Sequence, residues 1–264
     1  MLYNPEKESI FLRIVTQKIR DKMTRLSVNL NKIALLRNQR DIGIPSVIEA
    51  AETVIKAGAH GITVHPRPDQ RHIKYADVYE LARMLTVEFN IEGNPFTGKF
   101  MELVTQVKPS QATLVPDAPD ANTSDHGWNL QKNRKQLEPV IKKLKSSGIR
   151  VSLFMDTDIS GIEMAKESGA DRVELYTEPY ARAFRTNERL DEILELFVRA
   201  AQAAQNIGLG LNAGHDLNLK NLGKFCAAVP GILEVSIGHA LIADALEMGL
   251  YEAVKEYLKI LSKN

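Results

Sequence analysis

Four strand-like apolar segments of this chain each end in a side chain that can accept or donate a proton. The segments are Gly61–His65, Phe89–Glu92, Gly210–His215 and Glu234–His239. Runs of β-branched and aliphatic residues are typical of buried parallel strands. In a parallel barrel, the residues at the strand ends converge on one rim, however far apart they lie in the sequence. The pattern therefore predicts that imidazoles and a carboxyl group meet at one site, a combination suited to general acid–base catalysis.

The elements that would position these groups alternate regularly along the chain. Strands are predicted near residues 26–31, 60–65, 89–92, 111–115, 149–154, 172–176, 209–213 and 233–237. Helices are predicted from Pro45 onwards and near 75–87, 97–107, 131–147, 159–168, 188–207, 218–228, 240–248 and 250–262. This alternation leaves a barrel or a doubly wound sheet. Because Val28–Ile33 lacks the glycines of a dinucleotide-binding loop, we expect an α/β fold, a (β/α)₈ TIM barrel with extra helices.

The length of 264 residues suits one barrel domain, since such barrels typically have about 250 residues. We assign residues 23–264 to this domain. Residues 1–22 are interpreted as an N-terminal extension, because a short amphipathic stretch followed by charges precedes the first strand. The extension is either an accessory helix or the product of a wrongly chosen upstream start codon. We favour the second explanation, which mass spectrometry of the native N-terminus would test.

The composition argues against several kinds of partner. The formal net charge is +1, from 34 basic and 33 acidic residues, which predicts neither nucleic-acid binding nor a polybasic membrane contact. We recognise neither a signal peptide nor an apolar run of the roughly 20 residues that span a bilayer, so we expect a cytoplasmic protein. Cys226 is the only cysteine, which excludes an internal disulfide and a cysteine-rich zinc site.

Several polar residues are expected at the same rim because each lies at or near a strand end. They are Asn29, Asn31, Lys32, His65, Arg67, Glu92, Thr113, Glu174, Asn212, His215, Gly238 and His239. The loop His65–His72 is the densest cluster, and its arginines suit a phosphate or carboxylate group. Gly238 and His239 begin the helix after strand eight, where barrels often bind phosphate through backbone N–H groups. Alternatively, Gly238 lets this helix pack closely against its strand.

Glu92 and His215 are the main candidates for proton transfer. Desolvation at the end of strand three would raise the pKa of Glu92 toward neutrality, although a salt-bridged core glutamate is the alternative. His215 follows a glycine, and an imidazole there could shuttle protons near neutral pH. Asn29 and Asn31 on strand one are weak ligands for a transition metal, so we expect no metal.

The ordered set of motifs resembles the pyridoxine 5′-phosphate synthase family over about Leu26 to Leu261. The motifs are Val28–Arg40, Gly58–Arg67, Arg71–Ile73, Asn90–Glu92, Leu114–Pro116, Arg150–Phe154, Asn212–His215 and Ile237–His239. The resemblance implies a cofactor-free barrel enzyme that condenses 1-deoxy-D-xylulose 5-phosphate with 3-amino-2-oxopropyl phosphate. The products would be pyridoxine 5′-phosphate, phosphate and water. It further implies small phosphorylated molecules as partners and a homo-oligomer, an octamer built from dimers.

The resemblance also implies roles for individual residues. His65 and Glu92 would accept protons and His215 would donate one. Contacts to the aminoketone phosphate would come from Asn29, Gly238 and His239, and contacts to the sugar phosphate from Arg40, Arg67, His72 and Thr123. Thr123 would belong to a mobile lid.

This chain departs from the common family pattern in three places. It has Asn31 and Lys32 where many members carry Asp and His, and Asp216 where glycine is usual. The lid sequence also differs, with Asp117–Gly127 in place of an acidic Thr-Thr-Glu-Gly-Gly form. Substrate contacts at these positions are therefore open. The competing readings are another phosphosugar isomerase or lyase with Glu92 as base, and a non-catalytic barrel that binds pyridoxine phosphate.

Overall fold

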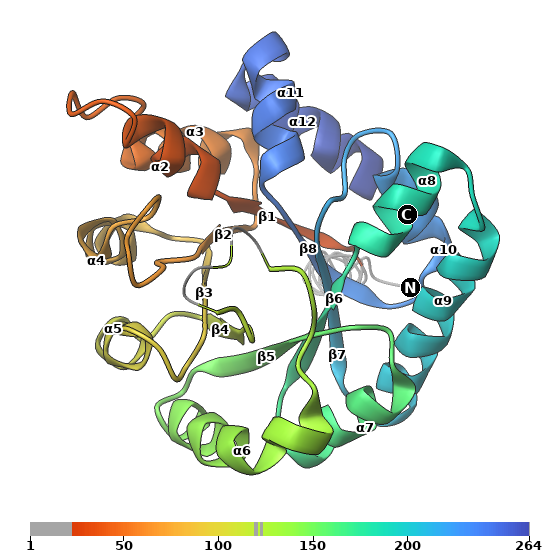
Figure 1. Ribbon diagram of the computed structural model, residues 1–264. Helices are drawn as coiled ribbons and strands as arrows, with labels where there is room; N and C mark the ends of the chain where they lie inside the picture. The colour runs from red at the N-terminus through yellow and green to blue at the C-terminus, as the bar shows by residue number, and fades with distance from the viewer. Residues whose placement is uncertain (1–22, 119–120, 122–123, 264) are drawn as a thin grey trace, which may run out of the picture.

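Eight parallel strands form a closed barrel at the centre of the molecule, with helices around it (Figure 1). The computed structural model describes residues 23–118, 121 and 124–263. The strands follow one another in sequence order, and β8 pairs with β1. They are β1 Arg25–Asn29, β2 Gly61–Val64, β3 Glu88–Gly93, β4 Gln111–Leu114, β5 Arg150–Met155, β6 Arg172–Tyr176, β7 Gly210–His215 and β8 Ile232–Ile237. The predicted (β/α)₈ TIM barrel with extra helices is confirmed. The predicted N-terminal extension, residues 1–22, lies outside the described residues.

Eleven helices accompany the barrel in the part of the chain that is described. They are α2 Asn31–Arg37, α3 Val47–Ala57, α4 Tyr75–Met84, α5 Phe100–Val107, α6 Leu130–Ser146, α7 Ile159–Glu167, α8 Glu178–Thr186, α9 Leu190–Asn206, α10 Leu222–Ala228, α11 His239–Met248 and α12 Leu250–Leu261. Two of them, α2 and α8, each precede the longer helix that returns the chain to the next strand, and α11 precedes α12, the last helix. The sequence prediction missed α2 and α8, which are short, with seven and nine residues.

The first βα unit differs from its predicted boundaries. Strand one ends at Asn29 rather than 31, because the Asn29 Oδ1 atom accepts a hydrogen bond from the Asn31 backbone N–H at 3.0 Å and the chain turns into α2. The helix predicted from Pro45 begins at Val47 instead. Ser46 caps it, accepting a hydrogen bond from the Glu49 backbone N–H at 3.2 Å, so Pro45 precedes the cap.

The apolar core lies between the strands and the helices, whereas the barrel interior is polar. Leu26, Val28 and their counterparts on the other strands are fully buried. The alternate positions carry buried polar side chains, namely Ser27, Thr63, Asn90, Gln111, Thr113, Ser152, Glu174, Asn212, Glu234 and Ser236. Many of these groups satisfy one another: the Thr113 hydroxyl donates to Asn90 Oδ1 at 2.9 Å. Since barrel interiors are usually filled with branched aliphatic residues, this polar interior indicates a functional requirement.

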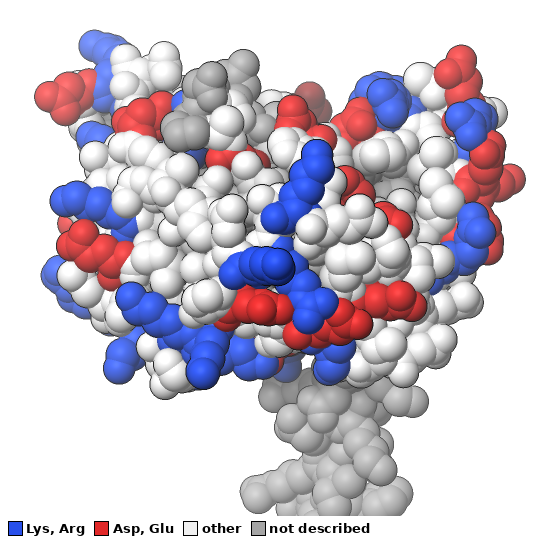
Figure 2. Space-filling view, turned by 60° about the horizontal axis from the view of Figure 1, so that its bottom comes forward, with Lys and Arg blue, Asp and Glu red and all other residues white. Residues whose placement is uncertain are grey.

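An ion-pair network closes the N-terminal end of the barrel. Glu88 on β3 contacts Arg25 at 2.5 Å and also Arg150. Both arginines hold the pKa of Glu88 below its ordinary value, although its partial burial works the other way. Basic and acidic side chains are interspersed on the outer face in Figure 2. Within the described ranges, none of the helices is long and apolar enough to cross a bilayer.

Candidate active site

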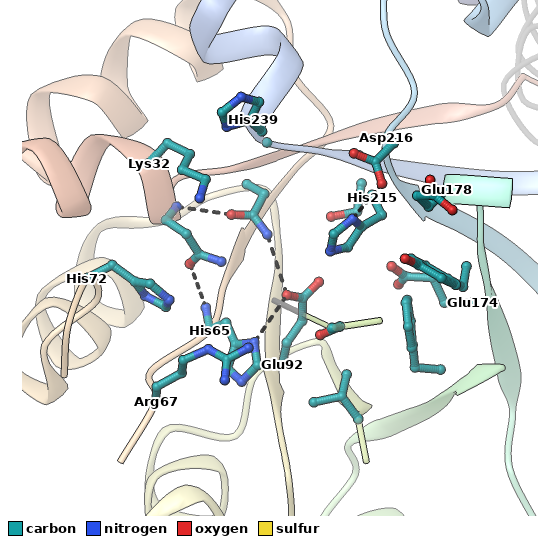
Figure 3. Close-up of a pocket in the computed structure, with 18 residues that line it drawn as sticks. Lys32, His65, Arg67, His72, Glu92, Glu174, Glu178, His215, Asp216 and His239 are labelled. Atoms are coloured by element: carbon teal, nitrogen blue, oxygen red, sulfur yellow. Dashed lines mark hydrogen bonds and ion pairs between the residues drawn. The ribbon is translucent and has the colours of Figure 1, made fainter. Parts of the chain in front are cut away.

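A cavity of about 380 Å³ opens at the C-terminal end of the barrel. Eleven of the residues predicted to form the site line it: Asn29, Asn31, Lys32, His65, Arg67, His72, Glu92, His215, Asp216, Gly238 and His239 (Figure 3). They come from the ends of β1, β2, β3, β7 and β8 and from the segments that follow. The barrel thus brings together groups that are up to 210 residues apart in the chain. Their roles in substrate binding and catalysis stay predictions.

Two asparagines on the first βα unit orient the proton-transfer groups. The Asn29 side-chain amide lies 3.4 Å from Glu92 Oε2, while Asn31 Oδ1 accepts a hydrogen bond from the His65 backbone N–H at 2.9 Å. His65 Nδ1 is 3.9 Å from the same Glu92 oxygen. The Asn31 side-chain oxygen therefore anchors the end of β2, a contact that an aspartate at this position could also make.

The protonation of Glu92 and His65 is strongly shifted by their surroundings. Burial raises the pKa of Glu92 to about 7, and the neighbouring His215 opposes that rise. Burial also lowers the pKa of His65 well below its usual value, with help from the positive charge of Arg67. At neutral pH the imidazole of His65 is therefore neutral and able to accept a proton. Glu92 exchanges protons readily, as a general acid–base group should.

His215 occupies a strained position at the end of β7. Its φ angle is 100°, a backbone conformation that non-glycine residues rarely adopt and that costs about 1–3 kcal/mol. The ring contacts Tyr176 edge-on, with 5.5 Å between centroids, and Nδ1 lies 2.9 Å from Asp216 Oδ2. Burial works to raise the pKa of Asp216, but the hydrogen bond and charge of His215 keep it below its ordinary value. Asp216 is therefore held in its ionised form beside the imidazole of His215.

The N-terminus of α11 forms one wall of the cavity. A Cβ atom at Gly238 would lie 3.1 Å from the Asn29 Cβ atom, so glycine allows the helix to start close to β1. The close approach is thus to β1, whereas the alternative drawn from the sequence was packing against strand eight. A helix N-terminus at a cavity wall suits an anion. Lys32 and His239 lie on this side of the cavity (Figure 3). Together they make this wall suitable for an anion.

Arg67 and the neutral imidazole of His72 form a second region of hydrogen-bond donors on the cavity wall. Arg67 Nη2 donates to Asp117 Oδ2 at 2.6 Å, and both side chains are buried. The Ser124 hydroxyl donates to the same oxygen at 2.7 Å, which ties the segment after β4 to Arg67. Burial lowers the pKa of His72 to about 4, with Arg67 and Lys32 adding to the effect. Since His72 Nδ1 accepts the Ile73 backbone N–H at 2.9 Å, its Nε2 carries the donor proton.

Some predicted residues lie elsewhere. Arg40 is exposed and does not line the cavity, because α2 ends at Arg37 and the chain leaves the rim. Thr123 lies outside the described residues. Thr113 and Asn212 do not reach the rim either, since they are fully buried in the barrel interior. The predicted contacts of Arg40 and Thr123 with substrate stay predictions.

Glu174 is the main residue that the predicted catalytic set lacked. It is buried on β6 and lines the cavity on the wall opposite Lys32 and His72 (Figure 3). Its Oε2 atom has no hydrogen-bond partner among the described residues. Burial raises the pKa of Glu174 well above its usual value, and the charge of Glu92 adds to this. Its place on an apolar strand was visible in the sequence, but its burial beside a second carboxyl was not.

An aromatic wall and other polar groups complete the cavity. Phe154 and Tyr176 stand beside His215, with 5.5 Å between their own ring centroids. Ser124, Glu178, Ser236 and Val115 also line the cavity, and none was singled out from the sequence. Among residues 23–118, 121 and 124–263, no cluster of three or more His, Cys, Asp or Glu side chains has a metal-binding arrangement.

The fold and this cavity define a (β/α)₈ barrel enzyme with titratable and basic side chains at its C-terminal rim. Solved structures with low identity share the fold. A protein of Aquifex aeolicus VF5 matches with a TM-score of 0.61 at 15% identity, covering 94% of this chain and 96% of that one. Phosphoribosylanthranilate isomerase of Thermotoga maritima matches with a TM-score of 0.56 at 14% identity, covering 92% and 100%.

Sequence comparison identifies the family. The model for pyridoxal phosphate biosynthesis protein PdxJ matches residues 26–263, and the chain belongs to this family. Pyridoxine 5′-phosphate synthase of Parabacteroides distasonis is 54% identical over 235 residues, covering 89% of this chain and 98% of the relative. The synthase of Christiangramia forsetii is 52% identical over 239 residues, covering 90% and 100%. The family resemblance and the prediction of an enzyme are confirmed.

Proposed function

We propose that this protein condenses 1-deoxy-D-xylulose 5-phosphate with 3-amino-2-oxopropyl phosphate. The products are pyridoxine 5′-phosphate, phosphate and water, and no cofactor takes part. The observation that carries this proposal is the meeting of His65, Glu92 and His215 at one cavity, with Glu92 shifted to a pKa of about 7. The names of the relatives support the product.

The protonation states support a division of labour among these groups. Imine formation, enolisation and dehydration each require proton transfers, typically worth about 10²–10⁴ in rate. The neutral His65 and the ionised form of Glu92 accept protons. His215, which Asp216 orients through a hydrogen bond to Nδ1, donates one to a departing oxygen. Glu174 faces Glu92 and, in its neutral form, donates a hydrogen bond to a developing negative charge without adding a second one.

Two separate regions of hydrogen-bond donors support two phosphorylated substrates. The N-terminus of α11, with Lys32 and His239, suits the phosphate of the aminoketone. Arg67 and His72 suit the sugar phosphate, on the side of the segment that follows β4. A helix N-terminus contributes only about 0.3–2 kcal/mol, whereas micromolar binding requires about 8 kcal/mol. The side-chain donors therefore supply most of the affinity.

The direct test is to incubate the purified protein with both substrates and follow the absorbance of pyridoxine 5′-phosphate. Glu92→Gln should fold and bind but turn over at least about a hundredfold more slowly. Near-normal turnover would remove Glu92 from the mechanism. Conversion of one substrate alone would instead indicate an isomerase or lyase. Tight binding of the product without turnover would indicate a binding protein.

His239→Ala tests the proposed wall for the aminoketone phosphate. The variant should raise KM for this substrate and leave KM for the sugar phosphate unchanged. Unchanged affinity for both substrates would show that His239 lies outside the phosphate site.

We also propose that the protein works in the cytoplasm as a homo-oligomer, an octamer built from dimers. Six of the ten exposed large hydrophobic side chains in the described ranges lie on α2, the turn after it, α11 and the start of α12. They are Leu36, Ile42, Ile44, Leu246, Met248 and Tyr251. Helix α2 packs beside α11, so these side chains favour one shared contact surface. If light scattering gave the mass of a monomer at working concentrations, it would contradict the proposal.

A further inference from the structure

Glu234 is a buried carboxyl group that lies in the barrel interior, one layer below the cavity. Ser236 on the same strand lines the cavity, whereas Glu234 does not and is only 3% exposed. Residues two apart on a strand face the same side and are roughly 6.6 Å apart. Glu234 therefore points into the interior just beneath the groups that form the cavity floor.

A hydrogen-bonded relay holds the Glu234 carboxyl group in place. The Asn212 side-chain amide donates to Glu234 Oε1 at 3.4 Å, and Arg172 Nη1 donates to Asn212 Oδ1 at 3.0 Å. Arg172 thus reaches Glu234 through Asn212 rather than by direct contact. The carboxyl group is anchored, but its charge is not cancelled by an adjacent cation.

The same asparagine sets the spacing between Glu234 and the cavity. Asn212 is in register with Glu174 on β6 and with Glu234 on β8. Two strand spacings separate the backbones of the two glutamates by about 10 Å. Two like charges at about this distance shift each other's pKa by about one unit in a protein interior. The charge of Glu234 therefore affects the pKa of carboxyl groups that line the cavity.

Charged groups face Glu234 from both ends of the barrel. They are Arg25, Glu88, Arg150 and Arg172 toward the N-terminal end, and Glu92 and Glu174 toward the cavity. Most of the charged groups at the N-terminal end are paired with one another, because Glu88 forms ion pairs with Arg25 and Arg150. The N-terminal groups act on the pKa of Glu234, and the charge of Glu234 in turn raises the pKa of the two carboxyl groups above it.

We propose that Glu234 is a positioning residue for the reaction. By holding or releasing a proton in the layer beneath the cavity, it decides how readily Glu92 and Glu174 lose theirs. This inference rests on the proposed function, because both glutamates act there in proton transfer or charge stabilisation.

The electrostatics of the three carboxyl groups support this role. Burial raises the pKa of Glu234 to about 7, and Arg172 only partly opposes the rise. After burial, the charge of Glu234 is among the causes that raise the pKa of Glu92 and that of Glu174. The pKa values of all three carboxyl groups are therefore raised, and ionisation of Glu234 opposes ionisation of the other two. A purely structural ion pair would instead have a lowered carboxyl pKa, as Glu88 does.

The pH profile of Glu234→Gln tests the proposal. This variant keeps the shape and the hydrogen bond to Asn212 but removes the charge. In this variant, we expect the acidic limb of the pH profile of kcat/KM to move about one unit toward lower pH, while KM stays unchanged. Glu234→Asp should restore the wild-type pH profile. Glu163→Gln is the matched control, since it removes a carboxylate on the exposed face of α7 and should not move the limb. A folded Glu234→Gln variant with an unmoved limb would overturn the proposal.

A titration of the wild-type protein provides a second test that requires neither a variant nor turnover. With ¹³Cδ-labelled glutamate, NMR should show three carboxyl signals with midpoints above about pH 6, from Glu92, Glu174 and Glu234. Fewer than three such signals would overturn the inference even if the enzyme is active. Three signals in a protein that forms no product would leave the carboxyl cluster in place and reject the proposed reaction instead.

Discussion

Removing the Glu92 carboxyl group should change the pH dependence of stability as well as activity. Glu92 is held in a site that favours its neutral form, since burial raises its pKa from an ordinary 4.5 to about 7. In the unfolded chain the same carboxyl ionises at its ordinary pKa. Between these two values the folded protein binds more protons than the unfolded chain. Stability from this group is therefore present at low pH and is lost as the pH rises through about 7.

The size of the effect follows from the two pKa values. Protonation of Glu92 stabilises the folded state by about 2.5 kcal/mol more at pH 5 than at pH 8, from the standard linkage relation. Glu92→Gln has no such group. The free energy of unfolding of the variant, relative to wild type, should therefore rise by about 2.5 kcal/mol between pH 5 and pH 8. The variant gains this relative stability while it loses turnover.

Urea unfolding at several pH values measures this difference. Trp128 is the only tryptophan, is buried, and donates its indole N–H to the Leu114 carbonyl at 2.9 Å, so its fluorescence reports the folded barrel. Glu163→Gln on the exposed face of α7 is the matched control and should run parallel to wild type at every pH. If the difference in the free energy of unfolding between Glu92→Gln and wild type stays constant from pH 5 to pH 8, the reasoning is refuted.

Three further predictions follow from the geometry of the site. Because His215 has a φ angle of 100°, His215→Gly should be about 1 kcal/mol more stable than His215→Ala in urea unfolding; equal stabilities would argue against backbone strain. A Cβ atom at position 214 would lie 2.3 Å from Glu174 Oε1, so Gly214→Ala should displace this carboxylate and cut turnover by about a hundredfold at nearly unchanged Tm. Wild-type turnover in that variant would show that the position of Glu174 is unimportant. Dialysis against EDTA should leave activity unchanged, and a loss restored by a divalent metal would contradict the expected metal independence.

The sequence alone determined the architecture and most of the cavity lining. Strand-length apolar runs alternate with amphipathic helices, and this local pattern follows from side-chain burial within each element. His65, Glu92 and His215 lie at strand ends, so the barrel topology alone brings them together. The boundaries of β1 and α3 were less accurate. They depend on single hydrogen bonds from Asn29 and Ser46, which periodicity does not reveal.

Only the tertiary structure decided how these groups are charged and held. The role of Asn31 in anchoring β2, the contact of Arg67 with Asp117, and the burial of Glu174 beside Glu92 all join different strands. Such contacts depend on strand register and on the depth of each side chain, and neither is encoded in local sequence spacing. The pKa of a carboxyl group follows the charges and solvent around it in space. The sequence was therefore sufficient to identify the proton-transfer groups. Their protonation states, and the carboxyl group of Glu234 beneath them, could be identified only from the folded barrel.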